Sequence, residues 1–224
     1  MITTAFVKIW GETIGAVAWD SEQELALFEY EPNFHKLNWD LAPLKMPIKQ
    51  NNTFSFPELR APKNTEFDTF KGLPGLLADV LPDKYGNQMI NLWLAQQGRP
   101  ENSMNPVEQL CFIGSRGMGA LEFEPTNQQL NEKVQKIEIS SLVDVASNRL
   151  KNRESFKANL DSYEEKTIKQ LITIGTSAGG ARPKAVIAYN EETGEVRSGQ
   201  TKTPKGFTHW IIKLDGVNDI QLGS

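Results

Sequence analysis

The sequence predicts an α+β protein, in which a small N-terminal antiparallel β-sheet with helices precedes a second part built from a glycine loop and strands. Three observations carry this prediction. The first 31 residues contain three short segments enriched in β-branched and aromatic residues. Apolar residues then recur at helical spacing from Leu73 to Val80. Further along, the glycine-rich segment 175–184 leads directly into another apolar, strand-like run.

Three strands are expected at the start of the chain. They cover residues 6–10, 14–19 and 25–30, and a turn at Gly11 separates the first two as in a hairpin. The following stretch, 31–71, is irregular and rich in Pro and Asn, but its phenylalanines are too frequent for a solvated linker. We therefore expect a packed loop there, with a strand near 53–56.

Helices are expected in the middle of the chain. Four apolar residues lie on one helical face at i, i+3, i+4 and i+7, namely Leu73, Leu76, Leu77 and Val80. Pro82 ends this run, and two more helices are expected at about 84–97 and 106–112. The glycine-rich turn 114–119 then feeds a strand at 120–124, which we expect to close the N-terminal sheet.

The polar segment 125–136 is the best candidate for a domain boundary. It predicts one subdomain over 1–125 and a second over 137–224. Capping-box patterns at 141–144 and 162–165 predict two helices at the start of the second subdomain, because their side chains satisfy the free N–H groups of a first helical turn.

Composition sets the broad class of the protein. The 224 residues are 39% hydrophobic, enough to bury a core, and the net charge of −4 argues against direct nucleic-acid binding. Any DNA contact is expected to be local or through a partner. The single Cys111 rules out an internal disulfide framework, and no signal peptide or membrane-spanning run is visible. We therefore expect a soluble cytoplasmic protein.

The segment 175–184, Gly-Thr-Ser-Ala-Gly-Gly-Ala-Arg-Pro-Lys, is the most informative part of the chain. It matches neither the Walker A spacing nor the dinucleotide fingerprint, and locally a helix cap at Gly175 followed by a tight turn is the simpler interpretation. Its context favours a phosphate site. Lys184 opens a strand at 185–189, and Lys213 lies in an otherwise apolar strand at 208–214, where an ammonium needs an anion or an exposed end.

Other chemical sites have weaker support. His35 and His209 are the only histidines and have no Cys or carboxylate at ligand spacing, so a zinc-type site is not expected. Ser177 and Cys111 have no recognisable His/Asp partner for nucleophilic catalysis. Asp79 and Asp83 flank a predicted helix end, and a capping or solvated role suits them better than catalysis.

Four motifs in this order resemble the HipA family of bacterial toxin kinases. They lie at 72–86, at 112–121, at 179–184 and at 209–213 (His-Trp-Ile-Ile-Lys), so the resemblance extends over nearly the whole chain. It implies a kinase-like N-lobe after the first subdomain and the activity of a protein Ser/Thr kinase that uses ATP and Mg²⁺. It also implies a helix-turn-helix antitoxin of the HipB type as partner, and an aminoacyl-tRNA synthetase as a possible substrate.

Matching motif positions imply residue roles. The residues that would hold the ATP phosphates are Gly179, Gly180, Ala181, Lys184 and Lys213. Ser177 resembles the loop serine that relatives autophosphorylate to switch the kinase off, and Arg182-Pro183 follows a variant of the loop. The family's second lobe carries the catalytic Asp and the metal-binding Asn and Asp, and none of these has a match here. We therefore assign no catalytic or metal-binding residue in this chain.

Two alternatives remain beside the first interpretation, which is the N-terminal part of a HipA-like kinase, truncated before its catalytic lobe and inactive alone. The chain could instead be a catalytically inert binding or regulatory protein that pairs with a separate kinase or antitoxin chain. A globular domain without a nucleotide site is the third interpretation, and it applies if Lys213 points to solvent.

Overall fold

The computed structural model describes residues 1–48, 53–62, 68–126, 172, 184–200 and 203–213. These residues form two antiparallel sheets and several helices, which confirms the α+β class. The chain divides into two compact units, Met1–Leu81 with Met104–Asn127, and Pro82–Ser103 with Gln128–Ser224. Each unit is described by itself below, and the ranges 1–125 and 137–224 stay a prediction.

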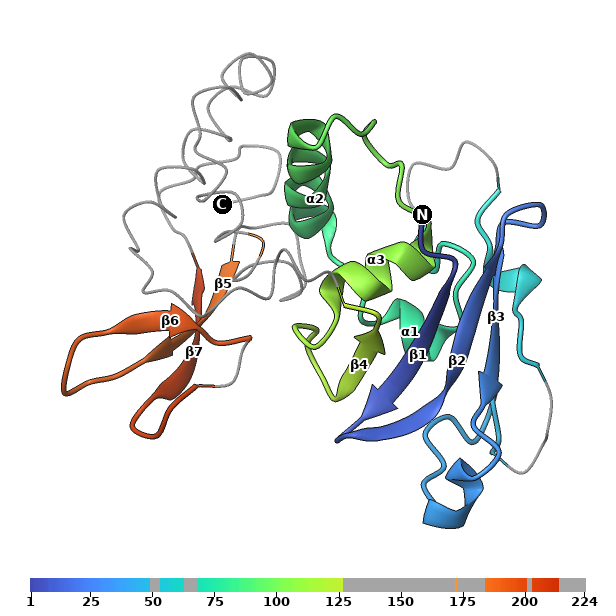
Figure 1. Ribbon diagram of the computed structural model, residues 1–224, viewed down its shortest axis with the longest axis horizontal. Helices are drawn as coiled ribbons and strands as arrows, with labels where there is room; N and C mark the ends of the chain where they lie inside the picture. Colours follow the sequence, from blue (N-terminus) through green and yellow to red (C-terminus); the bar gives the residue numbers. More distant parts are fainter. Residues whose placement is uncertain (49–52, 63–67, 127–171, 173–183, 201–202, 214–224) are drawn as a thin grey trace, which may run out of the picture. The chain divides into compact units, whose positions relative to one another are not determined.

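The first unit contains a four-stranded sheet in the order β3-β2-β1-β4 (Figure 1). Its strands are β1 (Thr4–Ile9), β2 (Glu12–Asp20), β3 (Leu25–Tyr30) and β4 (Leu121–Glu124). Every neighbouring pair is antiparallel. The three predicted N-terminal strands are confirmed, and so is the closure of the sheet by the strand after the glycine turn.

The stretch between β3 and the first α-helix is irregular and does not form the predicted strand. The strand expected at 53–56 is reduced to one isolated bridge between Phe28 and Phe54. Two short 3-10 helices, Phe34–Leu37 and Pro57–Leu59, lie in this stretch. The expected packing role of its aromatic residues is confirmed, because Phe34 and Phe54 are buried in the core.

Two α-helices complete the first unit. The periodicity at 73–80 yields only a short α1 (Gly75–Ala78), which Pro74 precedes and a looser turn follows, in which Val80 N donates to Leu77 O at 3.2 Å. The second, α3 (Pro106–Ile113), is confirmed and is buried along its whole length. Its N-cap Asn105 accepts from Glu108 N at 2.8 Å and donates to Ile2 O at 2.8 Å, which ties the helix to the start of the chain.

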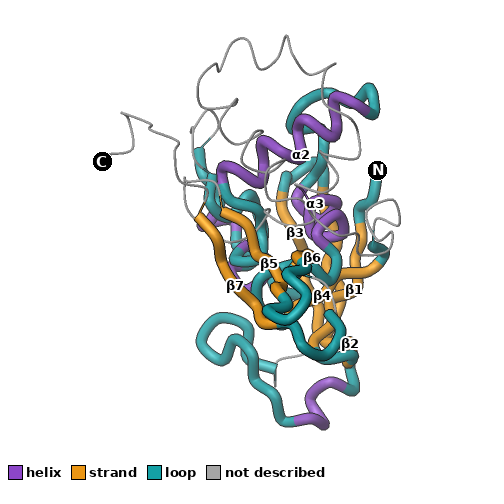
Figure 2. Tube along the Cα trace, turned by 90° about the vertical axis from the view of Figure 1, so that its left-hand side faces the viewer, coloured by secondary structure: helices purple, strands orange, loops and turns teal. Residues whose placement is uncertain are grey.

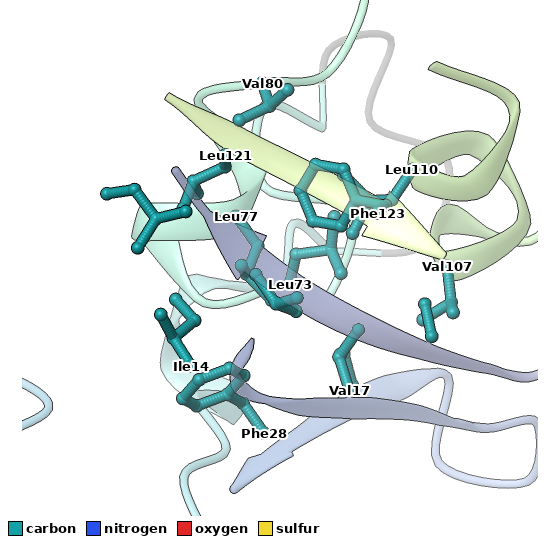
Figure 3. Packing of buried hydrophobic residues seen from close by; sticks show 14 of the residues in the cluster. Ile14, Val17, Phe28, Leu73, Leu77, Val80, Val107, Leu110, Leu121 and Phe123 are labelled. Atoms are coloured by element: carbon teal, nitrogen blue, oxygen red, sulfur yellow. The ribbon is translucent and has the colours of Figure 1, made fainter. Parts of the chain in front are cut away.

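The core of the first unit lies between the sheet and these helices. Figure 3 shows Leu73 and Leu77 of the α1 region, Val107 and Leu110 of α3, and Val17 and Phe28 of the sheet converging on it. Strand β1 alternates in the manner expected of a half-buried strand, with Ala5, Val7 and Ile9 facing the core. The opposite face of the sheet therefore carries Phe6 and its neighbours.

The second unit contains one described α-helix and a three-stranded sheet. Helix α2 (Lys84–Gln96) is confirmed, and Asp83 caps it by accepting from Gly86 N at 2.8 Å. Strands β5 (Lys184–Tyr189), β6 (Val196–Ser198) and β7 (Thr208–Lys213) are arranged side by side in the order β6-β5-β7 (Figure 2). The helices predicted from the capping boxes at 141–144 and 162–165 lie outside the described residues.

Across the described ranges, no helix combines the length and the apolar character that crossing a membrane requires.

Candidate functional site

The second sheet positions both lysines singled out from the sequence. Strand β5 lies in the middle, with four consecutive buried apolar residues, Ala185 to Ala188, after Lys184. Strand β7 pairs with it in antiparallel register along its whole length. Because β5 begins and β7 ends at a lysine, the two strands bring these residues to the same end of the sheet.

Lys184 and Lys213 are direct cross-strand partners. Residues opposite each other on antiparallel strands project from the same face, with Cβ atoms about 4.5–5.5 Å apart. The side chain of Lys184 is half-buried and that of Lys213 is exposed. Exposure alone explains how the Lys213 ammonium is tolerated at the end of β7. This is the condition for the third interpretation, a globular domain without a nucleotide site. Exposure does not explain why two like charges face each other, an arrangement that is destabilising by itself.

Apolar residues follow the two lysines on the same face of the sheet, and one of them, Ile211, is exposed. The next residues on this face are Val186 and Ile211, which are also direct partners, and Ile211 is 55% exposed. Ala188 and His209 form the following pair. An anionic group beside the two lysines would thus lie next to the exposed apolar side chain of Ile211.

The remaining predicted site residues lie outside the described part of the chain. Gly179, Gly180 and Ala181, expected to bind phosphate, belong to it, as does Ser177, expected to be phosphorylated. Lys184 and Lys213 are the predicted site residues that the structure describes. Their exact opposition could not be read from the sequence, because register depends on pairing across a separation of 29 positions.

The histidines occupy unrelated places. His35 lies in the 3-10 helix Phe34–Leu37 of the first unit and His209 in β7 of the second, and both are exposed. Among the described residues, no group of three or more His, Cys, Asp or Glu could hold a metal ion. The structure therefore offers no described ligand set to which Mg²⁺ could be assigned.

Arg116 is a buried residue that sequence reasoning did not single out. It lies in the glycine turn after α3, is 3% exposed, and donates from Nε to Ile113 O at 3.2 Å and from Nη2 to Phe112 O. Burial lowers the pKa of its guanidinium to about 10. The cation satisfies the last carbonyls of α3, where the helix dipole favours positive charge, so it is a structural cap. A basic residue directly after a predicted helix was the available signal.

Cys111 is a structural thiol and should react slowly. It lies in α3 with no exposed surface, and burial, followed by the nearby Glu108 carboxylate, raises its pKa from 9.0 to about 12. At pH 8 this shift alone reduces the thiolate fraction by roughly 10³-fold. We expect iodoacetamide to label the folded chain at least a hundredfold more slowly than the guanidinium-denatured chain, as measured by mass spectrometry. Comparable rates would contradict the buried position of the thiol.

The same shift has a consequence for stability against pH. A pKa raised in the folded state means that folding favours the neutral thiol. The stability that this preference contributes to the folded state is complete below pH 9 and is lost as the pH rises toward 12. Tyr30 acts in the same direction, because burial and then Asp40 raise its pKa to about 12 while its hydroxyl donates to Met46 O at 2.9 Å. Unfolding by alkali should therefore expose both groups together.

These features define a class of protein. It has a small α+β unit, whose sheet packs on helices with one face only, and a second unit with an antiparallel sheet that carries two opposed lysines. Comparison with known proteins is more specific. The family described as HipA N-terminal domain matches residues 5–124, more than half of the chain. The chain therefore belongs to the HipA family of HipA-like toxins, in a toxin–antitoxin context. Among curated proteins, none matches this chain.

Proposed function

We propose that this chain is the nucleotide-binding part of a HipA-like protein Ser/Thr kinase, and that Lys184 and Lys213 bind the phosphates of ATP. The observation that carries the proposal is the direct opposition of these two lysines on one face of the second sheet. An anion between them replaces mutual repulsion with attraction to both charges. Gly179, Gly180 and Ala181 complete the proposed site, because glycine-rich backbone can approach phosphate oxygens closely.

An exposed apolar side chain beside the lysines suits the rest of the nucleotide. Ile211, which is 55% exposed on the face of the two lysines, offers an apolar side chain against which a base can lie. When bound, ATP with Mg²⁺ supplies a transferable phosphoryl group. The role of this chain in that reaction is to bind and orient the phosphates, which is the main task of a protein in phosphoryl transfer.

Calorimetric titration with ATP tests the proposal. We expect Lys184→Met and Lys213→Met each to weaken ATP binding by about 10- to 100-fold, since a hydrogen bond to a charged group contributes roughly 1.5–3 kcal/mol. Lys205→Met is the matched control, because Lys205 is exposed in the turn before β7 and outside the face in question. ATP affinity that both site variants retain would remove the assignment.

Thermal melts separate binding from folding in the same variants. Lys213 is exposed and lies opposite a like charge, so Lys213→Met should melt at or above the temperature of the unmodified protein. A loss of affinity without a loss of stability is then a binding effect. Weakened binding together with early melting would indicate that the lysines support the sheet instead.

Further assignments extend this proposal. We infer autophosphorylation of Ser177, whose added charge in a loop that receives ATP phosphates would lower nucleotide affinity. A helix-turn-helix antitoxin of the HipB type is the proposed partner, DNA is reached only through it, and an aminoacyl-tRNA synthetase is a possible substrate.

The second candidate function is that of a binding or regulatory protein that acts on a separate kinase or antitoxin chain. One observation favours it: the family match at 5–124 ends before the lysine-bearing sheet begins at Lys184. In that case the first unit carries the function, and the lysine variants would leave it unchanged.

A further inference from the structure

We propose that the open face of the first sheet docks a basic amphipathic helix of a partner protein. The open face is the side of the sheet opposite α3. Its centre is apolar and consists of Phe6, Ala16, Ala18 and Leu27, and its edges carry the carboxylates of Glu29, Glu122 and Glu124. This proposal is independent of the proposed nucleotide site, whose lysines belong to the second unit.

The apolar centre is unusually exposed for a position on a central strand. Phe6 lies on β1 between β2 and β4, yet 56% of its surface is exposed, and Leu27 on β3 is 38% exposed. Covering such side chains removes apolar surface from water, which favours docking. Ala16 and Ala18 on β2, the strand between those of Phe6 and Leu27, have small side chains that project little from the sheet. A partner can therefore approach this part of the sheet closely.

The charged edges select the kind of partner. Glu29, Ala16, Phe6 and Glu124 are consecutive cross-strand partners and form one row across the sheet, which runs from β3 to β4 (Figure 1). The row covers three strand spacings of about 4.8 Å each, or roughly 14 Å. An α-helix with its side chains is about 10–12 Å wide. A helix lying on Phe6 would therefore place its two flanks beside the two carboxylate edges.

Charge complementarity then favours Lys and Arg on those flanks. Lys8 lies on the central strand β1 opposite Glu122 and is engaged with Glu124 at 3.0 Å, so it offsets only part of the negative charge on the β4 side. The first unit as a whole contains eight basic and fourteen acidic residues, so its field attracts a basic partner. A second copy of this chain fits less well, because its open face would present carboxylates to carboxylates.

A pair of synthetic helical peptides tests the proposal on the full chain. The first places leucines at i, i+3, i+4 and i+7 with lysines on both flanks, and the second replaces those lysines with glutamates. We expect fluorescence anisotropy near physiological salt to show saturable binding of the lysine peptide and no binding of the glutamate peptide. Binding of neither peptide, or of both equally, would overturn the proposal.

Substitutions locate the binding on the open face. Phe6→Ser and the double change Glu29→Lys with Glu124→Lys should each weaken binding of the lysine peptide at least tenfold. The matched control is Glu22→Lys with Glu58→Lys, which alters the net charge equally at exposed positions in the β2–β3 turn and in the helix Pro57–Leu59. Its affinity should stay within twofold. Equal weakening by the control would show a general charge effect and reject the surface.

Two further measurements complete the test. Circular dichroism should give the same spectrum for all variants, and a variant that loses structure is replaced by the milder Phe6→Thr, which suits a strand. Size-exclusion chromatography should show no dimer of the unmodified chain that the Phe6→Ser change dissociates into monomers. Such a dimer would assign the open face to self-association and overturn the proposal.

Discussion

We expect Gly72→Ala to lower the free energy of unfolding of the first unit by about 3 kcal/mol. Gly72 has a φ of +74°, which costs a residue with a Cβ roughly 1–2 kcal/mol. Its Cβ would also lie 2.5 Å from the backbone oxygen of Glu24 and 3.4 Å from Leu25 Cα. The two segments are tied together, because Ala26 N donates to Gly72 O at 2.8 Å. Relief of the overlap therefore weakens this bond, and overpacking costs about 1–3 kcal/mol.

Gly11→Ala is the control that isolates the free-energy cost of the positive φ from the cost of steric overlap. Gly11 has a φ of +88° in the β1–β2 turn, but a Cβ there would meet nothing within 4 Å. We expect a loss of only about 1 kcal/mol. Native-state hydrogen exchange of peptides from β1 and β2 reports on the first unit by itself. If Gly72→Ala costs no more than Gly11→Ala, the close approach to Glu24 is not a constraint on this fold.

Gly15→Ala should be destabilising for the complementary reason. Gly15 lies in β2 without a positive φ, so alanine meets no backbone penalty there. Its Cβ, however, would lie 2.8 Å from Cζ of the Phe28 ring and closer still to the backbone oxygen of Glu29. Because Phe28 is fully buried, it has little room to move.

We expect Gly15→Ala to cost about 2 kcal/mol, within the range of 1–3 kcal/mol for overpacked cores. The same exchange measurement applies, and amides of β3 opposite Gly15 should lose protection first. A neutral or stabilising effect would mean that the sheet can shift around Phe28. The three glycines together then separate the backbone cost from the packing cost on one sheet.

Local patterns in the sequence predicted most of the first unit. Enrichment in β-branched and aromatic residues along β1 is a property of adjacent residues, so this strand was predictable. The helix predicted at 73–80 was too long, because apolar spacing takes no account of Pro74, which precedes α1, and residues after Ala78 form only a looser turn. The bridge between Phe28 and Phe54 likewise depends on a distant contact.

The candidate site shows the same division. That Lys184 and Lys213 belong to strands followed from the apolar runs around them. That they face each other depends on the register of β5 with β7, and a shift of one residue would place them on opposite faces. The glycine loop is outside the described residues, so its role stays a prediction. Phe6 was predicted as a strand residue, but its exposure follows from which face the helices cover.

The central position of β1 also has a consequence for synthesis of the chain. Strands β1 to β3 leave the ribosome within the first 30 residues, but β4, which pairs with the other edge of β1, follows roughly 90 residues later. At 5–20 residues per second this is a delay of about 5–20 s. During that time one edge of β1 has unpaired N–H and C=O groups, which other chains could engage. The nascent chain is thus most open to mispairing, and most in need of a chaperone, before Leu121–Glu124 emerges.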